Sequence, residues 1–242
     1  MQGLSASQMI GLWERGAGQH PVDRSLTLLA AACPEFTPEQ LWEFRIGRRD
    51  ACLLRLRERI FGPTMDATAN CPQCGETVEF TLRTADLDVD SAAVEQPQEL
   101  EEGEVAVRYR LPNSSDLAAI SRRSGVADAR QALLKRCVIE ASIDGALVDS
   151  EALSEQVVLK LAARLAEGDP QADLTLDLKC VECGHPWQIG FDIAAFLWTE
   201  IDALAKRLLS EVHILARAYG WSEADVLAMG AARRHFYLAM VG

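Results

Sequence analysis

Two short stretches of the chain each combine a pair of cysteines with a glycine. Residues 69–80 read ANCPQCGETVEF and residues 178–191 read LKCVECGHPWQIGF. A CxxC turn brings both sulfurs to the same side, and the glycine after it allows backbone conformations that other residues avoid. Two such turns would complete a tetrahedral shell of four thiolates around one ion. The sequence therefore predicts a structural zinc site, with no open coordination position for catalysis, made by Cys71, Cys74, Cys180 and Cys183.

The same cysteines could instead form two local disulfides or remain four unliganded thiols. In redox proteins a CxxC disulfide accompanies the start of a helix, whereas both pairs here are flanked by β-like runs, which favours shared metal binding. His185 follows the second pair and is an alternative ligand. Because four cysteines already fill the shell, we expect it at the surface or beside the site. Zinc content measured alongside thiol reactivity would distinguish this site from a thiol oxidoreductase.

The remaining cysteines and histidines offer no catalytic arrangement. The total of seven cysteines is odd, which fits poorly with the paired framework of a secreted protein. Three of them lie in apolar contexts and are expected in the core, namely Cys33, Cys52 and Cys137. The other histidines are single, without a sequence partner for a nucleophile–base pair, namely His20, His213 and His235. The phosphate loops GxxxxGK[ST] and GxGxxG and the hydrolase motifs HExxH and GxSxG are absent, so we predict a protein that is not an enzyme.

Composition indicates a packed globular protein. The chain has 242 residues, of which 49% are hydrophobic and 25% charged, and its formal net charge is −12. That negative charge disfavours general attraction to nucleic acid. The longest apolar stretches, such as LTLLAAAC at 26–33, are much shorter than the roughly 20 residues that cross a bilayer, and no leader pattern opens the chain. We therefore expect a soluble, cytoplasmic protein.

Hydrophobic periodicity and breakers divide the chain into five regions. An N-terminal helical region is expected over residues 1–63, with breaks at His20-Pro21, Cys33-Pro34 and Ile46-Gly47 and with Thr37 as an N-cap. The others are the first zinc knuckle with β-strands (64–113), a helical insert (114–170), the second knuckle (171–192) and a C-terminal helical arm (193–242). The predicted fold class is α+β, with zinc-ribbon-like hairpins stapled by the four-cysteine site.

Three segments carry more specific expectations. Arginines and leucines interleave in residues 45–59, which indicates an amphipathic helix with a wet charged side or, alternatively, a docking surface for an acidic partner. The acidic residues 84–104 suggest a solvated loop. In the insert, helices are expected near 128–140 and 151–167, the second with an apolar stripe made by Leu153, Val157, Leu161 and Leu165.

The C-terminal arm combines a long helix with a short capped one. An apolar seam advances by steps of three and four, Gly220 suits the end of the long helix, and Ser222 with Asp225 resembles a capping box. The seam could pack on the protein's own core or offer a face to a partner, with residues 233–237 as a charged and aromatic rim. Its residues are Leu197, Ile201, Leu204, Leu208, Val212 and Leu215.

Several of these stretches together resemble a known family. They include HPVDRSLTLLAAACPE, IGRRDACLLRLRERIFGP, CPQCGETVEF, LDLKCVECGHPWQIGFDIAAFLWTEI and RLLSEVHILARAYGWSEADVLAMGAARRHFYLAMV. The chain is similar to baseplate proteins of contractile phage tails and of related extracellular injection systems, and to the baseplate hub assembly chaperones of tailed phages. The resemblance implies a non-enzymatic structural or assembly factor whose partners are other baseplate or tail proteins. Such a factor would be made in the cytoplasm of the producing cell and could be carried into the particle.

A zinc-ribbon nucleic-acid-binding regulator or adaptor is the alternative from another class. A helix, Gly220 and a capped helix can be mistaken for a helix-turn-helix. The second helix of that arrangement, SEADVLAMG, has no arginine, lysine, asparagine or glutamine with which to read base edges. We therefore expect neither nucleic acid, membrane nor a small-molecule substrate among the partners.

Overall fold

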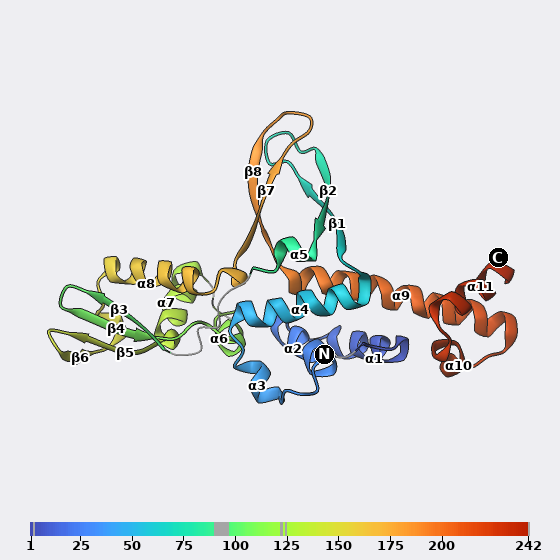
Figure 1. The fold of residues 1–242 in the computed structure, drawn as a ribbon, viewed down its shortest axis with the longest axis horizontal. Helices are drawn as coiled ribbons and strands as arrows, with labels where there is room; N and C mark the ends of the chain where they lie inside the picture. Colours follow the sequence, from blue (N-terminus) through green and yellow to red (C-terminus); the bar gives the residue numbers. More distant parts are fainter. Residues whose placement is uncertain (2, 90–96, 122, 124, 242) are drawn as a thin grey trace. The chain divides into compact units, whose positions relative to one another are not determined.

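The computed structural model describes residues 1, 3–89, 97–121, 123 and 125–241, and combines helices with small antiparallel sheets (Figure 1). The chain divides into two units. One joins residues 1–36 to residues 193–242, and the other comprises residues 37–192. Both ends of the chain therefore belong to one unit, and the two cysteine pairs belong to the other.

The first unit is helical. The predicted breaks separate its N-terminal helices, and Gly220, with φ of 69°, follows the long helix as expected. The Ser222–Asp225 capping box is confirmed. The helices are α1 (Ala6–Gly16), α2 (Pro21–Ala32), α9 (Ile193–Tyr219), α10 (Glu223–Ala228) and α11 (Ala231–Val241).

The apolar seam of α9 packs inside this unit. Leu197, Ile201 and Leu215 are fully buried, and α1, α2, α10 and α11 all contact α9. Of the two uses that the sequence left open for the seam, the structure shows the first, because the seam lines the unit's own core. None of the described helices is both long and apolar enough to span a membrane.

The second unit begins with α3 (Pro38–Trp42) and α4 (Ile46–Phe61). Thr37 caps α3 in a capping box with Gln40, as the sequence predicts for this N-cap. The charged side of α4 is only partly wet, which corrects the simpler expectation. Arg49 is buried against Asp50, with Nε donating to the carboxylate at 2.7 Å, and Arg57 is buried and donates to the carbonyl of Gly62.

The described residues of this unit also form three antiparallel sheets. The hairpin of β1 (Thr64–Asn70) and β2 (Thr77–Arg83) and the hairpin of β7 (Leu174–Lys179) and β8 (Pro186–Phe191) each form a two-stranded sheet. The third sheet has the order β3-β4-β5-β6. Its strands are β3 (Gln98–Glu102), β4 (Val105–Tyr109), β5 (Val138–Ile143) and β6 (Ala146–Val148).

Part of the segment predicted as an acidic loop has regular structure instead. Residues Thr84–Leu87 form the short helix α5, and Gln98–Glu102 form β3, while 90–96 lie outside the described residues. In β3, Leu100 is buried between the exposed Glu99 and Glu101, so this acidic strand places one apolar side chain on the inner face of the sheet.

The segment predicted as a helical insert contains helices and a hairpin. The helix expected near 128–140 ends at Cys137, after which β5 and β6 turn at Asp144-Gly145, both with positive φ. The apolar stripe predicted for the helix near 151–167 is confirmed, because Val157 and Leu161 are buried. Leu153, the first residue of the predicted stripe, is also buried but precedes this helix. The helices are α6 (Ser114–Ile120), α7 (Val126–Cys137) and α8 (Glu155–Gly168), with short 3₁₀ turns η1 (Ser150–Ala152) and η2 (Pro170–Ala172).

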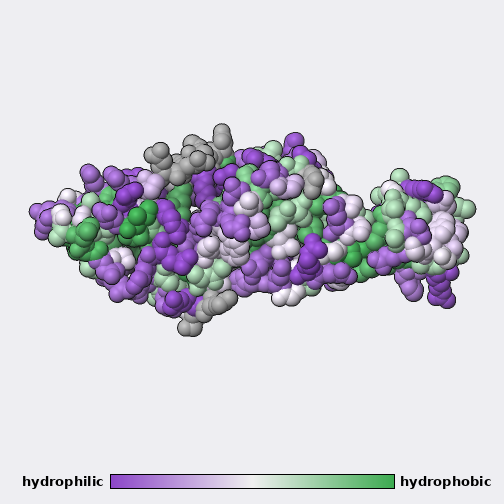
Figure 2. Space-filling model, turned by 90° about the horizontal axis from the view of Figure 1, so that it is seen from below, coloured by the Kyte–Doolittle hydropathy of each residue, from purple (hydrophilic) through white to green (hydrophobic). Residues whose placement is uncertain are grey.

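The four-stranded sheet and α7 and α8 share one hydrophobic core. Tyr109 and Leu161 lie at its centre, each at most 1% exposed. The β5–β6 hairpin also carries large apolar side chains on the outside, Ile139 and Leu147. Figure 2 shows hydrophobic atoms gathered among hydrophilic ones on the part of the surface that this sheet and its helices form.

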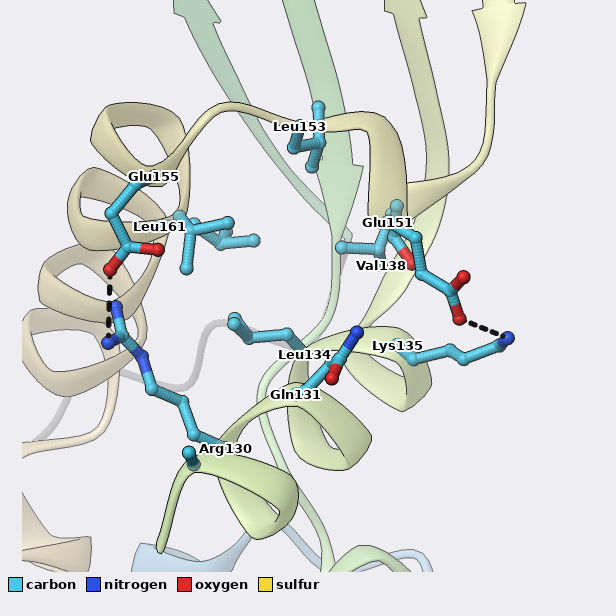
Figure 3. Close-up of a pocket in the computed structure, with 12 residues that line it drawn as sticks. Arg130, Gln131, Leu134, Lys135, Val138, Glu151, Leu153, Glu155 and Leu161 are labelled. Atoms are coloured by element: carbon cyan, nitrogen blue, oxygen red, sulfur yellow. Dashed lines mark hydrogen bonds and ion pairs between the residues drawn. The ribbon is translucent and has the colours of Figure 1, made fainter.

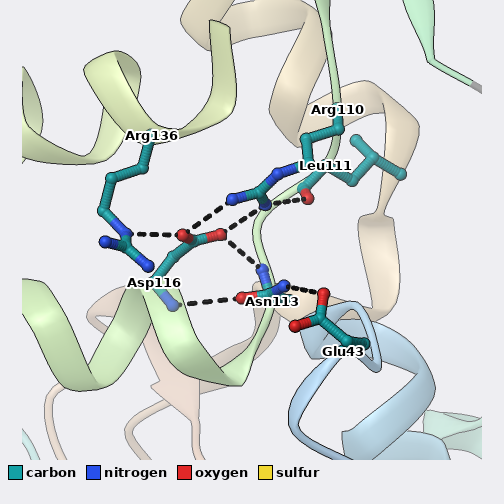
Figure 4. Close-up of polar contacts among 6 residues, drawn as sticks. All are labelled: Glu43, Arg110, Leu111, Asn113, Asp116 and Arg136. Atoms are coloured by element: carbon teal, nitrogen blue, oxygen red, sulfur yellow. Dashed lines mark hydrogen bonds and ion pairs between the residues drawn. The ribbon is translucent and has the colours of Figure 1, made fainter. Parts of the chain in front are cut away.

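A buried carboxylate ties this core to α3 (Figure 4). Asp116 has no exposed surface and accepts two hydrogen bonds from the Arg110 guanidinium at 2.6 and 2.9 Å, and one from Arg136 at 2.7 Å. It also accepts the backbone N–H of Asn113, whose side chain donates at 2.9 Å to Glu43, the residue that follows α3. Asp116 therefore joins the segment after β4 to α6 and α7, and Asn113 extends the network to the end of α3.

Gly47, in the first turn of α4, lies so close to its neighbours that a larger residue there should destabilise the fold. Gly47 donates its N–H to buried Asp169 at 2.7 Å, and a Cβ at Gly47 would lie 2.1 Å from the Asp169 Oδ1 and 2.9 Å from the Gln171 Cβ. We expect Gly47→Ala to lower the free energy of unfolding by about 1–3 kcal/mol, measured by urea denaturation. The matched control Gly11→Ala, on α1, would bring its Cβ only to an ordinary 3.7 Å from the Arg15 side chain and should be neutral or stabilising by up to about 1 kcal/mol. Equal effects of the two substitutions would contradict the close approach at Gly47.

Candidate metal centre

The two cysteine pairs lie in turns that join the strands of the two-stranded hairpins. Asn70 pairs with Thr77 in the first hairpin, and Lys179 pairs with Pro186 in the second, so each turn starts directly where its strand pairing ends. Exposed residues alternate with buried or partly buried ones along these strands, and each hairpin carries its cysteine turn at its tip (Figure 1).

The two turns repeat the same backbone hydrogen bonds. Cys71 donates its N–H to the carbonyl of Glu76 at 2.8 Å, and Cys180 donates to His185 at 2.9 Å. The glycine after each pair donates back to the first cysteine of that pair. Gly75 and Gly184 have φ of 79° and 72°, a region that favours glycine. The spacing that the sequence repeats thus produces the same turn twice.

The structure brings the four sulfurs together. The Sγ atoms of Cys71 and Cys183 are 3.7 Å apart, and those of Cys74 and Cys180 are 3.6 Å apart. All four Sγ atoms lie within 4.8 Å of one another. Four sulfurs at about 2.3 Å from a tetrahedral zinc ion would be separated by about 3.8 Å, so the donor set fits such an ion. The four residues are free thiols, and the cross-hairpin distances are far too long for disulfides.

Ionisation of the cluster is uneven. Burial opposes ionisation of Cys71, but the backbone N–H groups of Cys74 and Gln73 and the neighbouring thiols lower its pKa to about 7. The N–H of Glu76 acts in the same direction on Cys74, yet burial and the other sulfurs raise that pKa to about 12. One thiolate therefore forms readily and disfavours a second beside it. A bound cation would reverse this, since it favours the thiolate form of every ligand.

A small apolar cluster supports the sulfurs. Buried Cys71 and Cys180 pack with Val78 and with the partly buried Trp187. Val78 and Trp187 occupy equivalent places in the two turns, each seven positions after the first cysteine of its pair. The exposed Cys74 and Cys183 complete the set on the outer side. The repeated element therefore supplies both the donors and the apolar residues beneath them, which the spacing of the cysteines alone did not reveal.

The other residues singled out in the sequence lie elsewhere. Among the described residues, the group of metal-ligand atoms this close consists of the four cysteines and does not include His185. Cys33 and Cys137 are buried, as expected, and burial raises the pKa of Cys137 to about 12, which makes it a poor nucleophile. The His20 side chain caps α2 by accepting the N–H of Val22.

Comparison with protein families adds the decisive observation. A family model described as "T4 bacteriophage base plate protein" matches residues 26–198. The chain belongs to this baseplate family. The matched range includes both hairpins and all four cluster cysteines, and it confirms the resemblance to phage baseplate proteins. No match was found among curated proteins, nor among solved structures.

Proposed function

We propose that the protein is a non-enzymatic structural or assembly factor of the baseplate of a contractile phage tail or a phage-tail-like injection system, acting through contacts with other baseplate proteins. The observation that carries this proposal is the family match over residues 26–198. A role as a baseplate hub assembly chaperone is the narrower form of the same proposal. The protein would be made in the cytoplasm of the producing cell and could enter the particle.

The metal would serve this role by fixing architecture. We propose that Cys71, Cys74, Cys180 and Cys183 hold one structural zinc ion in a zinc-ribbon-like pair of hairpins. Four thiolates leave no coordination position for water or substrate, so the ion would staple two hairpins and carry out no reaction. The distances among the sulfurs and the identical turns support this assignment.

The C-terminal arm supplies a surface for partners on α11. Phe236 and Met240, 65% and 64% exposed, lie one turn apart on the same side of this helix. Arg234 on another side is buried and donates to Glu211 of α9 at 2.9 Å, so it fixes α11 and is not part of a charged rim. Tyr237 packs edge-on against Trp221, which fixes α11 further. A fixed helix that presents two large apolar side chains suits a protein interface.

Co-purification from the producing cell tests this role. A tagged chain should recover other baseplate proteins, identified by mass spectrometry, and Phe236→Ser combined with Met240→Ser should reduce that recovery about tenfold or more, because apolar anchors dominate interface energies. Leu159, on α8, is another large apolar side chain that is exposed. Leu159→Ser is therefore the control and should leave the recovery unchanged. Recovery of nucleic acid without tail proteins would contradict the proposed function and favour the regulator.

Probing purified particles separates the two forms of the proposal. A structural component should remain in the finished particle at a fixed ratio to the other baseplate proteins. An assembly chaperone should bind those proteins in lysates of cells that are assembling particles and be missing from the finished particle.

A further inference from the structure

A pocket of about 430 Å³ opens beside the four-stranded sheet, between α7, η1 and α8 (Figure 3). Its floor is apolar, and Figure 3 shows the labelled floor side chains directed toward the space between the two helices. The volume lies in the range of sites that accept one large side chain or a small ligand. The floor residues are Leu134, Val138, Leu153, Val158 and Leu161.

The two walls of the pocket carry opposite charges. Arg130 and Lys135 stand on the α7 side, and Glu151 and Glu155 stand on the side of η1 and α8. Each base faces an acid, with Lys135 3.0 Å from Glu151 and Arg130 3.4 Å from Glu155. A ligand lying in the pocket would therefore meet positive charge along one edge and negative charge along the other.

These wall pairs can exchange partners at little cost. The side chains are 39% to 74% exposed, and ion pairs in such positions contribute about 0–1 kcal/mol to stability. The Nη2 of Arg130 is buried and has no hydrogen-bond partner. Rotation of this guanidinium toward an acidic group on a ligand would satisfy that nitrogen. Arg130 therefore has a hydrogen-bond donor to offer to a ligand in the pocket.

We propose that this pocket binds an amphipathic segment of a partner protein, with one large apolar side chain in the floor. An acidic residue on one side of that anchor would meet Arg130 and Lys135, and a basic residue on the other side would meet Glu151 and Glu155. The inference rests on the proposed function, which makes the partner another baseplate protein. The opposite charges of the walls favour such a segment over an apolar small molecule, which would leave all four charges without new partners.

Selection from a display library of random peptides of about twelve residues, or about three helical turns, tests the proposal on the intact chain. The enriched peptides should share one leucine, isoleucine, methionine or phenylalanine flanked by an acid on one side and a base on the other. The affinity of an enriched peptide is then measured by fluorescence anisotropy. Absence of any enriched pattern, or enrichment of peptides without both charges, would overturn the proposal.

Two variants with a matched design locate the binding. Gln131 lines the pocket from an exposed position on α7, so Gln131→Trp should fill the pocket and weaken peptide binding at least about tenfold. Gln156 is also exposed, on α8, and does not line the pocket, so Gln156→Trp should change binding less than about twofold. Equal effects of the two tryptophans would overturn the assignment to this pocket.

Exchanging charged residues between the two walls tests whether the pocket recognises the charges of the peptide or only its apolar side chain. Lys135→Glu combined with Glu151→Lys preserves the ion pair while inverting one part of each wall. Each wall would then carry one base and one acid, so the exchanged protein should lose its preference between the enriched peptide and one whose acid and base are exchanged. An unchanged preference would overturn the role of the walls, and a concentration-dependent dimer that Gln131→Trp abolishes would show a second copy as the occupant and overturn the partner segment.

Failure of this inference is distinguishable from failure of the proposed function. If Gln131→Trp loses peptide binding but still recovers baseplate proteins from the producing cell in full, the pocket is not the baseplate contact, while the proposed function stands. If the unaltered chain recovers no baseplate protein, the proposed function fails whatever the peptides show.

Discussion

If the four cysteines hold zinc as proposed, replacing Cys180 with serine should abolish metal binding and unfold the two hairpins that carry the cysteine pairs. A serine hydroxyl is a poor zinc ligand, and the three remaining thiolates would no longer close the shell. Structural zinc contributes an apparent binding free energy of about 10–16 kcal/mol in small zinc-finger peptides at neutral pH. Each hairpin is only two-stranded, which is marginally stable alone, and the buried side chains beneath the sulfurs are few. Cys180→Ser should therefore lower the stability of the chain more than Gly47→Ala or Asp116→Ala does.

The measurement combines metal content with hydrogen exchange. The unaltered chain should carry one zinc ion and four thiols protected from a thiol reagent, and Cys180→Ser should lose the ion together with the protection of β1, β2, β7 and β8. Cys52→Ser is the matched control. Cys52 lies outside the cluster, so this variant should bind as much zinc as the unaltered chain. A metal-free wild-type chain with reactive thiols, or full zinc content in Cys180→Ser, would refute the four-cysteine site.

Local signals in the sequence were enough to locate most helices. The caps at Thr37 and Ser222 and the glycine at 220 are read from neighbouring residues only, and the structure confirms all three. The CxxC pairs were likewise visible as a repeated pattern. Their meeting was predictable because metal coordination imposes a chemical requirement, four ligands around one ion, that neither pair satisfies alone.

The β5–β6 hairpin was missed although its signal is present. The dipeptide Asp144-Gly145 follows the apolar residues Val138 and Ala141 and precedes Val148. An Asp-Gly dipeptide between two apolar runs is typical of a tight hairpin. The apolar residues of this stretch also fit the end of the preceding helix, so the sequence predicts a helix to residue 140, whereas α7 ends at Cys137. The Asp-Gly dipeptide is the more specific of the two signals, because a short apolar run fits a helix and a strand equally well.

Features that depend on side chains distant in sequence could not be predicted in this way. The contact of Asn113 with Glu43 joins residues 70 positions apart, and the walls of the pocket come from α7 and from η1 and α8. Charged residues in a sequence are mostly solvated, so nothing local distinguishes the fully buried Asp116 from an exposed aspartate such as Asp128. Only the tertiary arrangement shows which carboxylate is buried and what pairs with it.

Asp116→Ala should be the second most damaging change, lowering the free energy of unfolding by about 3 kcal/mol. It removes the carboxylate that accepts from both Arg110 and Arg136, and with it half of the capping box with Asn113. Breaking a buried ion pair costs about 3–5 kcal/mol, and the lower end applies because the arginine side chains are 35% and 41% exposed and can be rehydrated. Asp128→Asn, at an exposed aspartate on α7, should change stability by less than about 0.5 kcal/mol.

The pH dependence of the stability difference between wild type and Asp116→Ala tests whether the charged carboxylate is its cause. Burial opposes ionisation of Asp116, but hydrogen bonds from Arg110, the N–H of Asn113 and Arg136 outweigh it and lower the pKa. A lowered pKa stabilises the folded state above the unfolded value of about 3.9, and this stabilisation is lost as the pH falls through the folded value. Urea denaturation of wild type and Asp116→Ala should therefore differ by a constant amount from pH 7 to pH 5 and by less below about pH 4. A difference that stays constant at lower pH would show that Asp116 acts only through its shape, since protonation would then cost nothing.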